Sequence, residues 1–230
     1  MSETTVSEAN NGSNSQPSNI SEATIRIAGN SQDGIQSIGG FLARLAGRSE
    51  RDVMTMMTIP STIAGGPSIF QVRLGSGEVL SPGDKADVLF AFYQHSYDGH
   101  IKNLRKGGVM VYDSDHVEPR EECLTDYRHI GIAISSLTVE AIGGTGRDKG
   151  KNIYALGLIG RMFSLNTTKL ERLINERFSA KGESVAKTAM DAFQAGYRYQ
   201  GDDISNLFRL AKGGADRSNQ VVMSGNEAIG

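Results

Sequence analysis

The 230-residue chain contains one cysteine, Cys123, and no tryptophan. A single thiol excludes an internal disulfide framework, and it also excludes a self-contained iron–sulfur cluster, because such a cluster is held by several thiolates. Cys123 lies among Glu121, Glu122 and Asp126, whose negative charges disfavour the thiolate form that a cysteine nucleophile needs. This cysteine usage is typical of the reducing cytoplasm, where we expect the protein to be.

An excess of charge of either sign is also absent. The formal net charge is −2 at pH 7 and the sequence pI is about 6.1, so we expect no nucleic-acid partner. No apolar run approaches the roughly 20 residues that cross a bilayer, so no membrane span is expected. The N-terminus lacks the basic start and apolar core of a secretory signal.

Patterns that carry catalysis or bind metal are lacking as well. His95, His100, His116 and His129 show no i, i+4 pairing with a carboxylate, which argues against a zinc site. The chain has neither a G-x-S-x-G elbow nor a Ser–His–Asp order. We therefore expect no catalytic residue and no metal ligand in this chain.

What is present is an alternation of strand and helix patterns. Residues 1–22 are mostly small and polar, so we expect a disordered leader, because too little apolar surface is available to offset the entropy of ordering. Over 23–200, β-branched apolar runs alternate with segments of helical period. This alternation predicts an α/β domain of three layers, Rossmann-like, with a mostly parallel sheet and helices on both faces. Strands are expected at 23–29, 53–58, 68–74, 86–92, 109–112 and 129–134, and helices at 35–45, 95–104, 137–142, 153–163, 167–178 and 183–197.

The character of the chain changes again after residue 200. Residues 201–219 indicate a linker, in which 202–212 has the pattern of a short exposed helix. Residues 220–230 begin what we expect to be a new strand and turn, and the chain stops there. A strand that is begun and abandoned suggests a truncated or split polypeptide.

The first strand, turn and helix carry the strongest local signal. Gly29, Ser31 and Gly34 belong to a G-N-S-Q-D-G turn that opens directly into a helix. Backbone N–H groups at a helix N-terminus, together with the helix dipole, favour phosphate. The alternative interpretation, which stays open, is a turn that needs glycine only for its geometry. A nicotinamide site is disfavoured, because the turn departs from G-x-G-x-x-G and no acidic residue ends the second strand.

The loop 59–67 is a second candidate. Gly65 and Gly66 are adjacent and flanked by prolines, which gives an open turn that a ligand or partner can approach closely. Ser61 and Thr62 add hydroxyl donors. A plain sharp connection between neighbouring strands is the alternative, and local pattern does not separate the two.

Several segments, in order, carry a resemblance to a known family: 25–36, 60–73, 81–84 with 86–89, 107–114 and 151–157. Their order and spacing resemble the gamma domain of 2-oxoacid:ferredoxin oxidoreductases. The resemblance favours the version fused at the N-terminus of the alpha subunit in 2-oxoglutarate-type enzymes. Residues 224–228 are similar to the G-N-E-A segment that opens the pyrimidine-binding domain of that alpha subunit, so 220–230 are expected to start this domain.

The resemblance implies a supporting domain of an enzyme, not active alone, that converts 2-oxoglutarate to succinyl-CoA and passes electrons to ferredoxin. Thiamine diphosphate with Mg and iron–sulfur clusters perform the difficult steps in that family. This chain has neither a thiamine diphosphate motif nor cluster thiolates, so these groups are expected in partner subunits or domains. The implied partners are the remaining alpha domain, the thiamine-binding beta subunit and, through the complex, ferredoxin.

What remains for this domain is subunit assembly and a share of the coenzyme A site. The implied site residues are Gly29, Ser31, Asp33, Gly34 and Ile35, with Ser61, Thr62, Gly65 and Gly66 opposite. Asp33 is expected to order the turn rather than to touch phosphate.

Two departures from the family pattern border this region. Gln32 stands where the fused version has glycine, and Ala64 stands where many relatives have arginine. Loss of that arginine argues against direct anion binding by the loop. The competing hypotheses are a stand-alone nucleotide-binding or regulatory module and a purely structural interface domain.

Overall fold

The main sheet has six strands in the order β3-β4-β2-β5-β6-β7. The structure, a computed structural model, describes residues 18–58, 60, 65–143, 150–201, 204–205, 207–213, 221 and 223. Neighbours in the run β2-β5-β6-β7 are parallel, whereas β4 is antiparallel to both β2 and β3. The strands are β2 (Glu22–Asn30), β3 (Asp52–Met57), β4 (Pro67–Gly75), β5 (Ala86–Ala91), β6 (Leu104–Asp113) and β7 (Arg128–Ile132).

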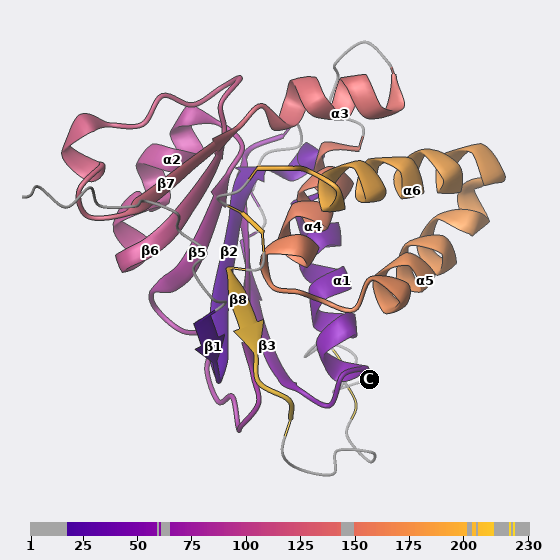
Figure 1. The fold of residues 1–230 in the computed structure, drawn as a ribbon, viewed down its shortest axis with the longest axis horizontal. Coiled ribbons are helices and arrows are strands. Elements are labelled where there is room, and N and C mark those ends of the chain that lie inside the picture. Colours follow the sequence, from indigo (N-terminus) through magenta and orange to yellow (C-terminus); the bar gives the residue numbers. More distant parts are fainter. Residues whose placement is uncertain are drawn as a thin grey trace, which may run out of the picture.

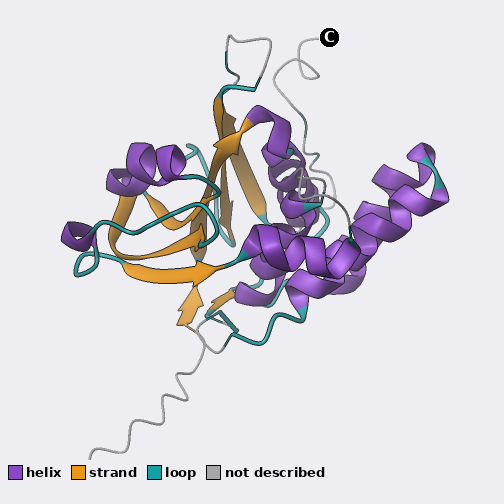
Figure 2. Cartoon of the chain, turned by 90° about the horizontal axis from the view of Figure 1, so that it is seen from above, coloured by secondary structure: helices purple, strands orange, loops and turns teal. Residues whose placement is uncertain are grey.

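Helices lie on both sides of this sheet (Figures 1 and 2). The α-helices are α1 (Ile35–Gly47), α2 (Gln94–His100), α3 (Ile134–Ile142), α4 (Lys151–Met162), α5 (Thr167–Phe178) and α6 (Glu183–Tyr197), with 3₁₀ turns η1 (Ser31–Asp33), η2 (Ile101–Asn103), η3 (Glu121–Cys123) and η4 (Ser179–Lys181). The predicted α/β fold with a mostly parallel sheet is confirmed. Within the described part of the chain, no helix is long and apolar enough to span a lipid bilayer.

The two faces of the sheet build two cores. Along β2, Ile25 and Ile27 point into the larger core, while Ala28 points to the opposite face, as the period of a strand requires. The larger core includes the buried stripe of α1 and residues of α4, α5 and α6. The smaller core is made with α2, through Tyr97 and the segment that follows it.

Helices α4 and α6 pack against one another at a pair of glycines. A Cβ on Gly157 would lie 2.3 Å from the carbonyl oxygen of Phe193, and one on Gly196 would lie 2.1 Å from that of Tyr154. The two backbones are therefore closer than any side chain between them would allow. This contact fixes where the C-terminal half of α6 crosses α4.

Two segments outside the expected domain are part of the fold. β1 (Ser18–Ile20) pairs in parallel with β8 (Phe208–Leu210). Residues 18–22 were expected in a disordered leader, but they are ordered in β1 and the start of β2. Residues 208–210 were expected in a helix, but they form a strand. Phe208 stacks on Phe163 with ring centroids 5.0 Å apart, and Leu210 is buried. This burial overrides the helical pattern of 202–212. Residues 1–17, and 220–230 apart from Val221 and Met223, lie outside the described residues.

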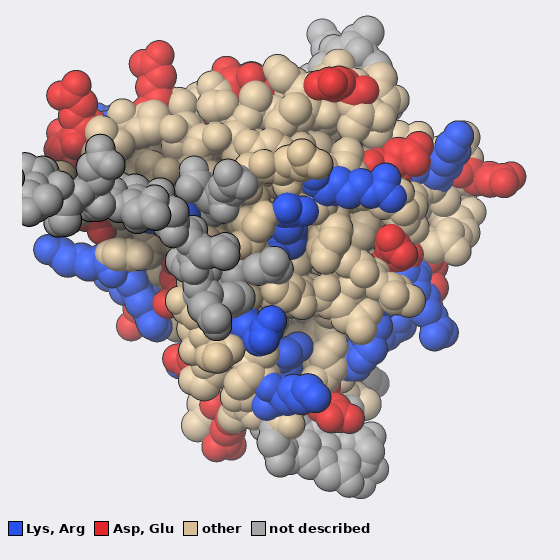
Figure 3. Space-filling view, in the orientation of Figure 1, with Lys and Arg blue, Asp and Glu red and all other residues tan. Residues whose placement is uncertain are grey.

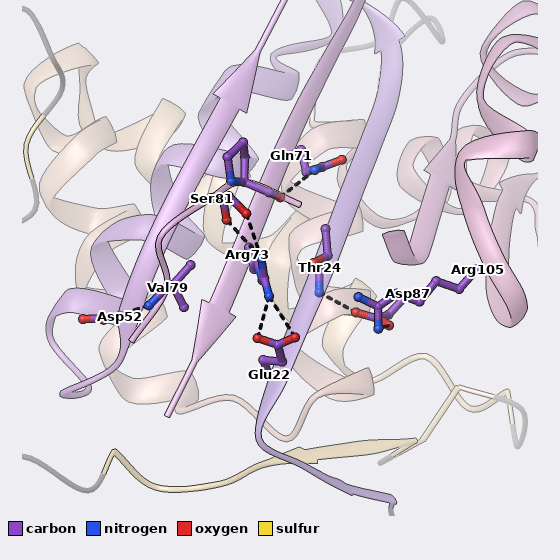
Figure 4. Close-up of polar contacts among 10 residues, drawn as sticks. Glu22, Thr24, Asp52, Gln71, Arg73, Val79, Ser81, Asp87 and Arg105 are labelled. Atoms are coloured by element: carbon purple, nitrogen blue, oxygen red, sulfur yellow. Dashed lines mark hydrogen bonds and ion pairs between the residues drawn. The ribbon is translucent and has the colours of Figure 1, made fainter. Parts of the chain in front are cut away.

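On the face of the sheet opposite α1, polar side chains hold the loop 76–85 (Figure 4). The Nε2 of Gln71 donates to the carbonyl oxygen of Pro82 at 2.7 Å, and the Nη1 of Arg73 donates to the Ser81 hydroxyl at 3.0 Å. The buried Arg26 guanidinium donates to the Gln71 side-chain oxygen at 2.7 Å. These bonds satisfy polar groups that burial would otherwise leave costly.

His100, at the end of α2, is expected to make the stability of the fold depend on pH. Burial lowers its pKa from the ordinary 6.5, and the positive charges of Arg26 and His95 lower it further. The unfolded state then binds this proton more tightly than the folded state, so the free energy of unfolding falls as pH drops below about 6.5. Urea denaturation between pH 5 and 7 should show a shallower fall for His100→Gln. The exposed His116→Gln variant should keep the wild-type slope; equal slopes for all three proteins would contradict the assignment.

Candidate functional site

The turn after β2 and the turn after β5 meet at the carboxyl ends of these two neighbouring strands. β2 has β4 on one side and the parallel β5 on the other, and the helix α1 leads away from β2 toward β3. This is the place where the chain connections diverge. In open α/β sheets, ligands bind outside the carboxyl ends of the strands at such a point.

A buried polar chain holds this corner together. The Asp33 carboxylate, with 3% of the residue exposed, accepts hydrogen bonds from the Asn30 N–H at 2.6 Å and from the Tyr93 hydroxyl at 2.8 Å. The ammonium of Lys151, 1% exposed, donates to the Tyr93 oxygen at 3.1 Å. It also lies over the Tyr93 ring, 4.4 Å from the centroid. This series of hydrogen bonds therefore links the turn after β2 to the start of α4.

Two glycines of the corner have left-handed backbones and close neighbours. Gly34 has φ 68°, and Asn152 packs against it while its Nδ2 donates to the Gly34 carbonyl oxygen at 3.3 Å. Gly65 has φ 59°, and its Cβ position would lie 2.7 Å from the side-chain nitrogen of Gln32. A side chain at either glycine would be strained and would clash.

The structure brings most of the expected site residues together. The Ser31 N–H donates to the carbonyl oxygen of Gly66 at 3.0 Å, so the Gly65-Gly66 bend lies directly against the β2 turn. Of the expected residues, Asp33 and Gly34 line the cavity described next, whereas Gly29, Ser31, Ile35, Gly65 and Gly66 do not line it. Ser61 and Thr62 lie outside the described residues.

Three helices begin at a single cavity of about 560 Å³ next to this corner. The N-caps of α1, α4 and α6 are Gly34, Gly150 and Gly182, and none provides a side-chain capping bond. The first N–H groups of a helix have no partner one turn earlier in the helix, so each of these termini is the positive end of a helix dipole. Gly34 and Gly150 line the cavity, as do Ser184 and Thr188 from α6. The arrangement suits a phosphate or diphosphate group.

Side chains add to this electrostatic character. Lys181 lines the cavity, and its ammonium lies 5.7 Å from the centroid of the Phe178 ring, which also lines it. Glu183 in the first turn of α6 opposes the positive potential in part. Ile153, Val185 and Ala189 contribute apolar wall. The cavity can therefore hold an anion together with an apolar part of the same ligand.

A second, more basic cavity of about 690 Å³ lies where α1 and α4 end. The face drawn in Figure 3 shows Lys and Arg gathered over this lower part of the molecule. Two of the cations that line it are bound to backbone carbonyls: Arg51 donates to Leu210 and Ala211, and Lys169 donates to Arg48. Arg48 pairs with Glu176. Cations at a helix C-terminus neutralise the dipole and satisfy the last carbonyls, which explains part of this basicity without a ligand.

Three residues of the site were not predicted from the sequence: Tyr93, Lys151 and Asn152. Lys151 and Asn152 stand at the head of the 151–157 segment that carried part of the resemblance, which was a usable signal. Tyr93 directly follows a strand, the usual place for site residues in such sheets. In the part of the chain that the structure describes, no group of three or more His, Cys, Asp and Glu residues could hold a metal ion.

Comparison with known proteins decides the family. The model of the pyruvate ferredoxin/flavodoxin oxidoreductase family matches residues 24–199, more than half of the chain. The chain belongs to this family. The resemblance drawn from the sequence motifs is thereby confirmed.

Individual relatives agree with this assignment. The 2-oxoglutarate oxidoreductase subunit KorA of Mycobacterium tuberculosis is 31% identical over 204 residues, 78% of this chain and 31% of that protein. A structure of 2-oxoglutarate:ferredoxin oxidoreductase from Magnetococcus marinus, with 2-oxoglutarate, coenzyme A and succinyl-CoA bound, has a TM-score of 0.73 at 28% identity. That likeness covers 85% of this chain and 34% of the other. The chain spans about a third of the length of both.

A separate gamma subunit shows the same fold almost from end to end. The keto/oxoacid ferredoxin oxidoreductase gamma subunit from Geobacter sulfurreducens PCA has a TM-score of 0.61 at 23% identity. The likeness covers 76% of this chain and 94% of that subunit. At this identity the likeness concerns the fold, which is that of a gamma domain.

Proposed function

We propose that this chain is the gamma-type domain of a 2-oxoacid:ferredoxin oxidoreductase that forms succinyl-CoA from 2-oxoglutarate. Family membership supports this proposal, and so do the names of the KorA relative and of the Magnetococcus enzyme. The thiamine diphosphate, Mg and iron–sulfur clusters of such an enzyme belong to partner subunits or domains. With one cysteine, the chain cannot itself hold a cluster.

The role of this domain is assembly with those partners and binding of coenzyme A. The single observation that carries the coenzyme A proposal is the cavity at which α1, α4 and α6 all begin without a side-chain cap. The three N-termini and Lys181 bind the diphosphate, and the apolar wall takes the adjoining arm. Binding energy from this remote end of the substrate positions the thiol for attack at the partner's reaction centre.

Calorimetry on the 230-residue chain with coenzyme A, NAD and ATP tests this role. Selective binding of coenzyme A supports it. Equal binding of NAD or ATP would favour the stand-alone nucleotide-binding module instead. If none of the three ligands gives a binding signal and the thiamine-binding subunit captures the chain, the purely structural interface domain is favoured.

A negative charge placed in the cavity is expected to weaken coenzyme A binding about tenfold or more. Thr188 lines the cavity from α6 and is exposed, so Thr188→Glu should fold while repelling the diphosphate. Thr188→Val has a similar shape without the charge and serves as the control. Dissociation constants from calorimetry check both variants, and equal affinities for the two would contradict the assigned site.

A further inference from the structure

The phosphate-competent cavity continues into a second groove along α1. This groove, of about 330 Å³, shares Ser37 with the first cavity. Phe41 of the groove and Phe178 of the first cavity are in contact, with ring centroids 6.3 Å apart. The two hollows thus lie side by side on the same surface of α1. The groove is lined by Gln36, Ser37, Gly40, Phe41, Arg44, Met57, Phe70 and Arg177.

Gly40 keeps the floor of the groove open. It lies inside α1, its backbone does not have a positive φ, and a Cβ at this position would meet none of the described residues within 4 Å. The neighbouring Gly39 differs, because a Cβ there would lie 2.0 Å from the Phe70 ring. Glycine weakens a helix relative to alanine, and the described residues give no steric reason for it at position 40. Its bare backbone leaves room for a ligand to approach the helix.

Two arginines from different helices face this groove. Arg44 lies in the last turn of α1 and Arg177 in the last turn of α5. Helix dipoles favour a cation at each place, as in the basic cavity described above. In contrast to Arg51 and Lys169 there, however, neither Arg44 nor Arg177 has a hydrogen-bond or ion-pair partner among the described residues. Two guanidinium groups on one groove form a fork for a phosphate.

Part of the lining of this groove is apolar. Phe41 and Phe70 are buried and form its base, and Met57 at the end of β3 is 50% exposed. A methionine thioether is flexible and polarisable, and it makes favourable contacts with aromatic rings. The groove therefore offers apolar contacts beside two guanidinium groups, which suits a purine nucleoside that carries a phosphate.

We propose that this groove binds the adenosine 3′-phosphate end of coenzyme A. The adenine lies between Met57 and the bare backbone at Gly40, and the 3′-phosphate lies between Arg44 and Arg177. Gly34 and Gly40 are about 9 Å apart along the axis of α1, a separation that one adenosine 3′-phosphate 5′-diphosphate can bridge. This inference rests on the proposed function and adds its specificity: the domain selects coenzyme A by its 3′-phosphate.

The test compares coenzyme A with dephospho-coenzyme A, which lacks only that phosphate. Calorimetry on the full 230-residue chain should give about tenfold or tighter binding for coenzyme A. Arg44→Ala and Arg177→Ala should each weaken coenzyme A about tenfold and leave dephospho-coenzyme A unchanged. Adenosine 3′,5′-bisphosphate should compete with coenzyme A for the wild type and lose this ability in both variants.

Matched controls separate this effect from general charge loss. Arg172 is an exposed arginine on α5 that pairs with Glu176 and lines neither cavity, so Arg172→Ala should leave both affinities unchanged. A Cβ at Gly40 meets none of the described residues within 4 Å and leucine is the better helix former, so the melting temperature of Gly40→Leu should equal or exceed that of the wild type. Its affinity for coenzyme A should nevertheless fall at least tenfold.

The possible outcomes distinguish failure of the groove assignment from failure of the proposed coenzyme A role. If both forms of coenzyme A bind equally well and the arginine variants change nothing, the groove assignment is overturned while the coenzyme A role stands. If neither form binds the wild-type chain, the proposed role fails and the groove assignment fails with it. Weakening of both forms alike in Arg44→Ala and Arg177→Ala would also overturn the 3′-phosphate assignment.

Discussion

Asp33→Ala is expected to lower the free energy of unfolding by about 2–4 kcal/mol, because it leaves two donors without their acceptor; urea denaturation followed by circular dichroism measures the loss. The substitution removes the carboxylate that is linked to the buried Lys151 ammonium through the Tyr93 hydroxyl. It also takes away the acceptor of the Asn30 N–H. Loss of an acceptor for buried donors costs more than loss of an exposed ion pair, because water cannot readily replace the acceptor in the interior.

A double-mutant cycle shows whether Asp33 and Lys151 act as a unit. Asp33→Asn keeps an acceptor oxygen without the charge and should lose less stability than Asp33→Ala. Lys151→Met removes the ammonium and keeps much of the volume. The double variant Asp33→Asn/Lys151→Met should be more stable than the sum of the two single losses predicts, by about 0.5–3 kcal/mol. Simple additivity would show that the three side chains are not coupled.

Gly157→Val is expected to cost about 3 kcal/mol or more, because its side chain meets backbone atoms of α6 that cannot move aside alone. The Cβ position is 2.3 Å from the Phe193 carbonyl oxygen and 2.6 Å from the Tyr197 backbone nitrogen. The two helices must therefore separate, which exposes the buried Ala192 and Phe193. The first turn of α6 moves with them, so coenzyme A binding should fall together with stability.

Gly160→Ala is the matched control on the same helix. Its Cβ position has ordinary contacts, the nearest at 3.4 Å from the Tyr197 ring. Alanine is the better helix former by about 1 kcal/mol, so this variant should be as stable as the wild type or more so. Thermal denaturation of the two variants side by side checks the pair. A Gly157→Val protein as stable as Gly160→Ala would contradict the close helix crossing.

Strong periodicity explains which elements could be predicted from the sequence. The strand at 23–29 and the helix at 35–45 correspond closely to β2 and α1, because Ile25, Ile27, Ile35, Ile38 and Phe41 are spaced as their buried faces require. The segment 95–104 was less accurate, since its end belongs to β6. Short elements lack enough periods to define their ends.

The turn after β2 could be predicted from the sequence, whereas the residues that surround it in the folded protein could not. The glycines of the β2 turn mark a special backbone, which the sequence displays directly. The cavity depends on α4 and α6, whose first residues lie more than a hundred positions further along the chain. Lysine is normally a surface residue, yet Lys151 is buried, and one of its polar contacts is the Tyr93 hydroxyl, which in turn donates to Asp33. No local pattern carries that information.

The sequence by itself determined the α/β alternation, the turn that opens α1, the family and the absence of thiolates for a cluster. Only the tertiary structure decided that three uncapped helices begin at one cavity, that Arg44 and Arg177 share a groove, and that β1 pairs with β8. The physical reason is the range of the forces involved. Periodicity and turn chemistry act over a few neighbouring residues, whereas a site is made by burial and backbone contacts between segments that only packing brings together.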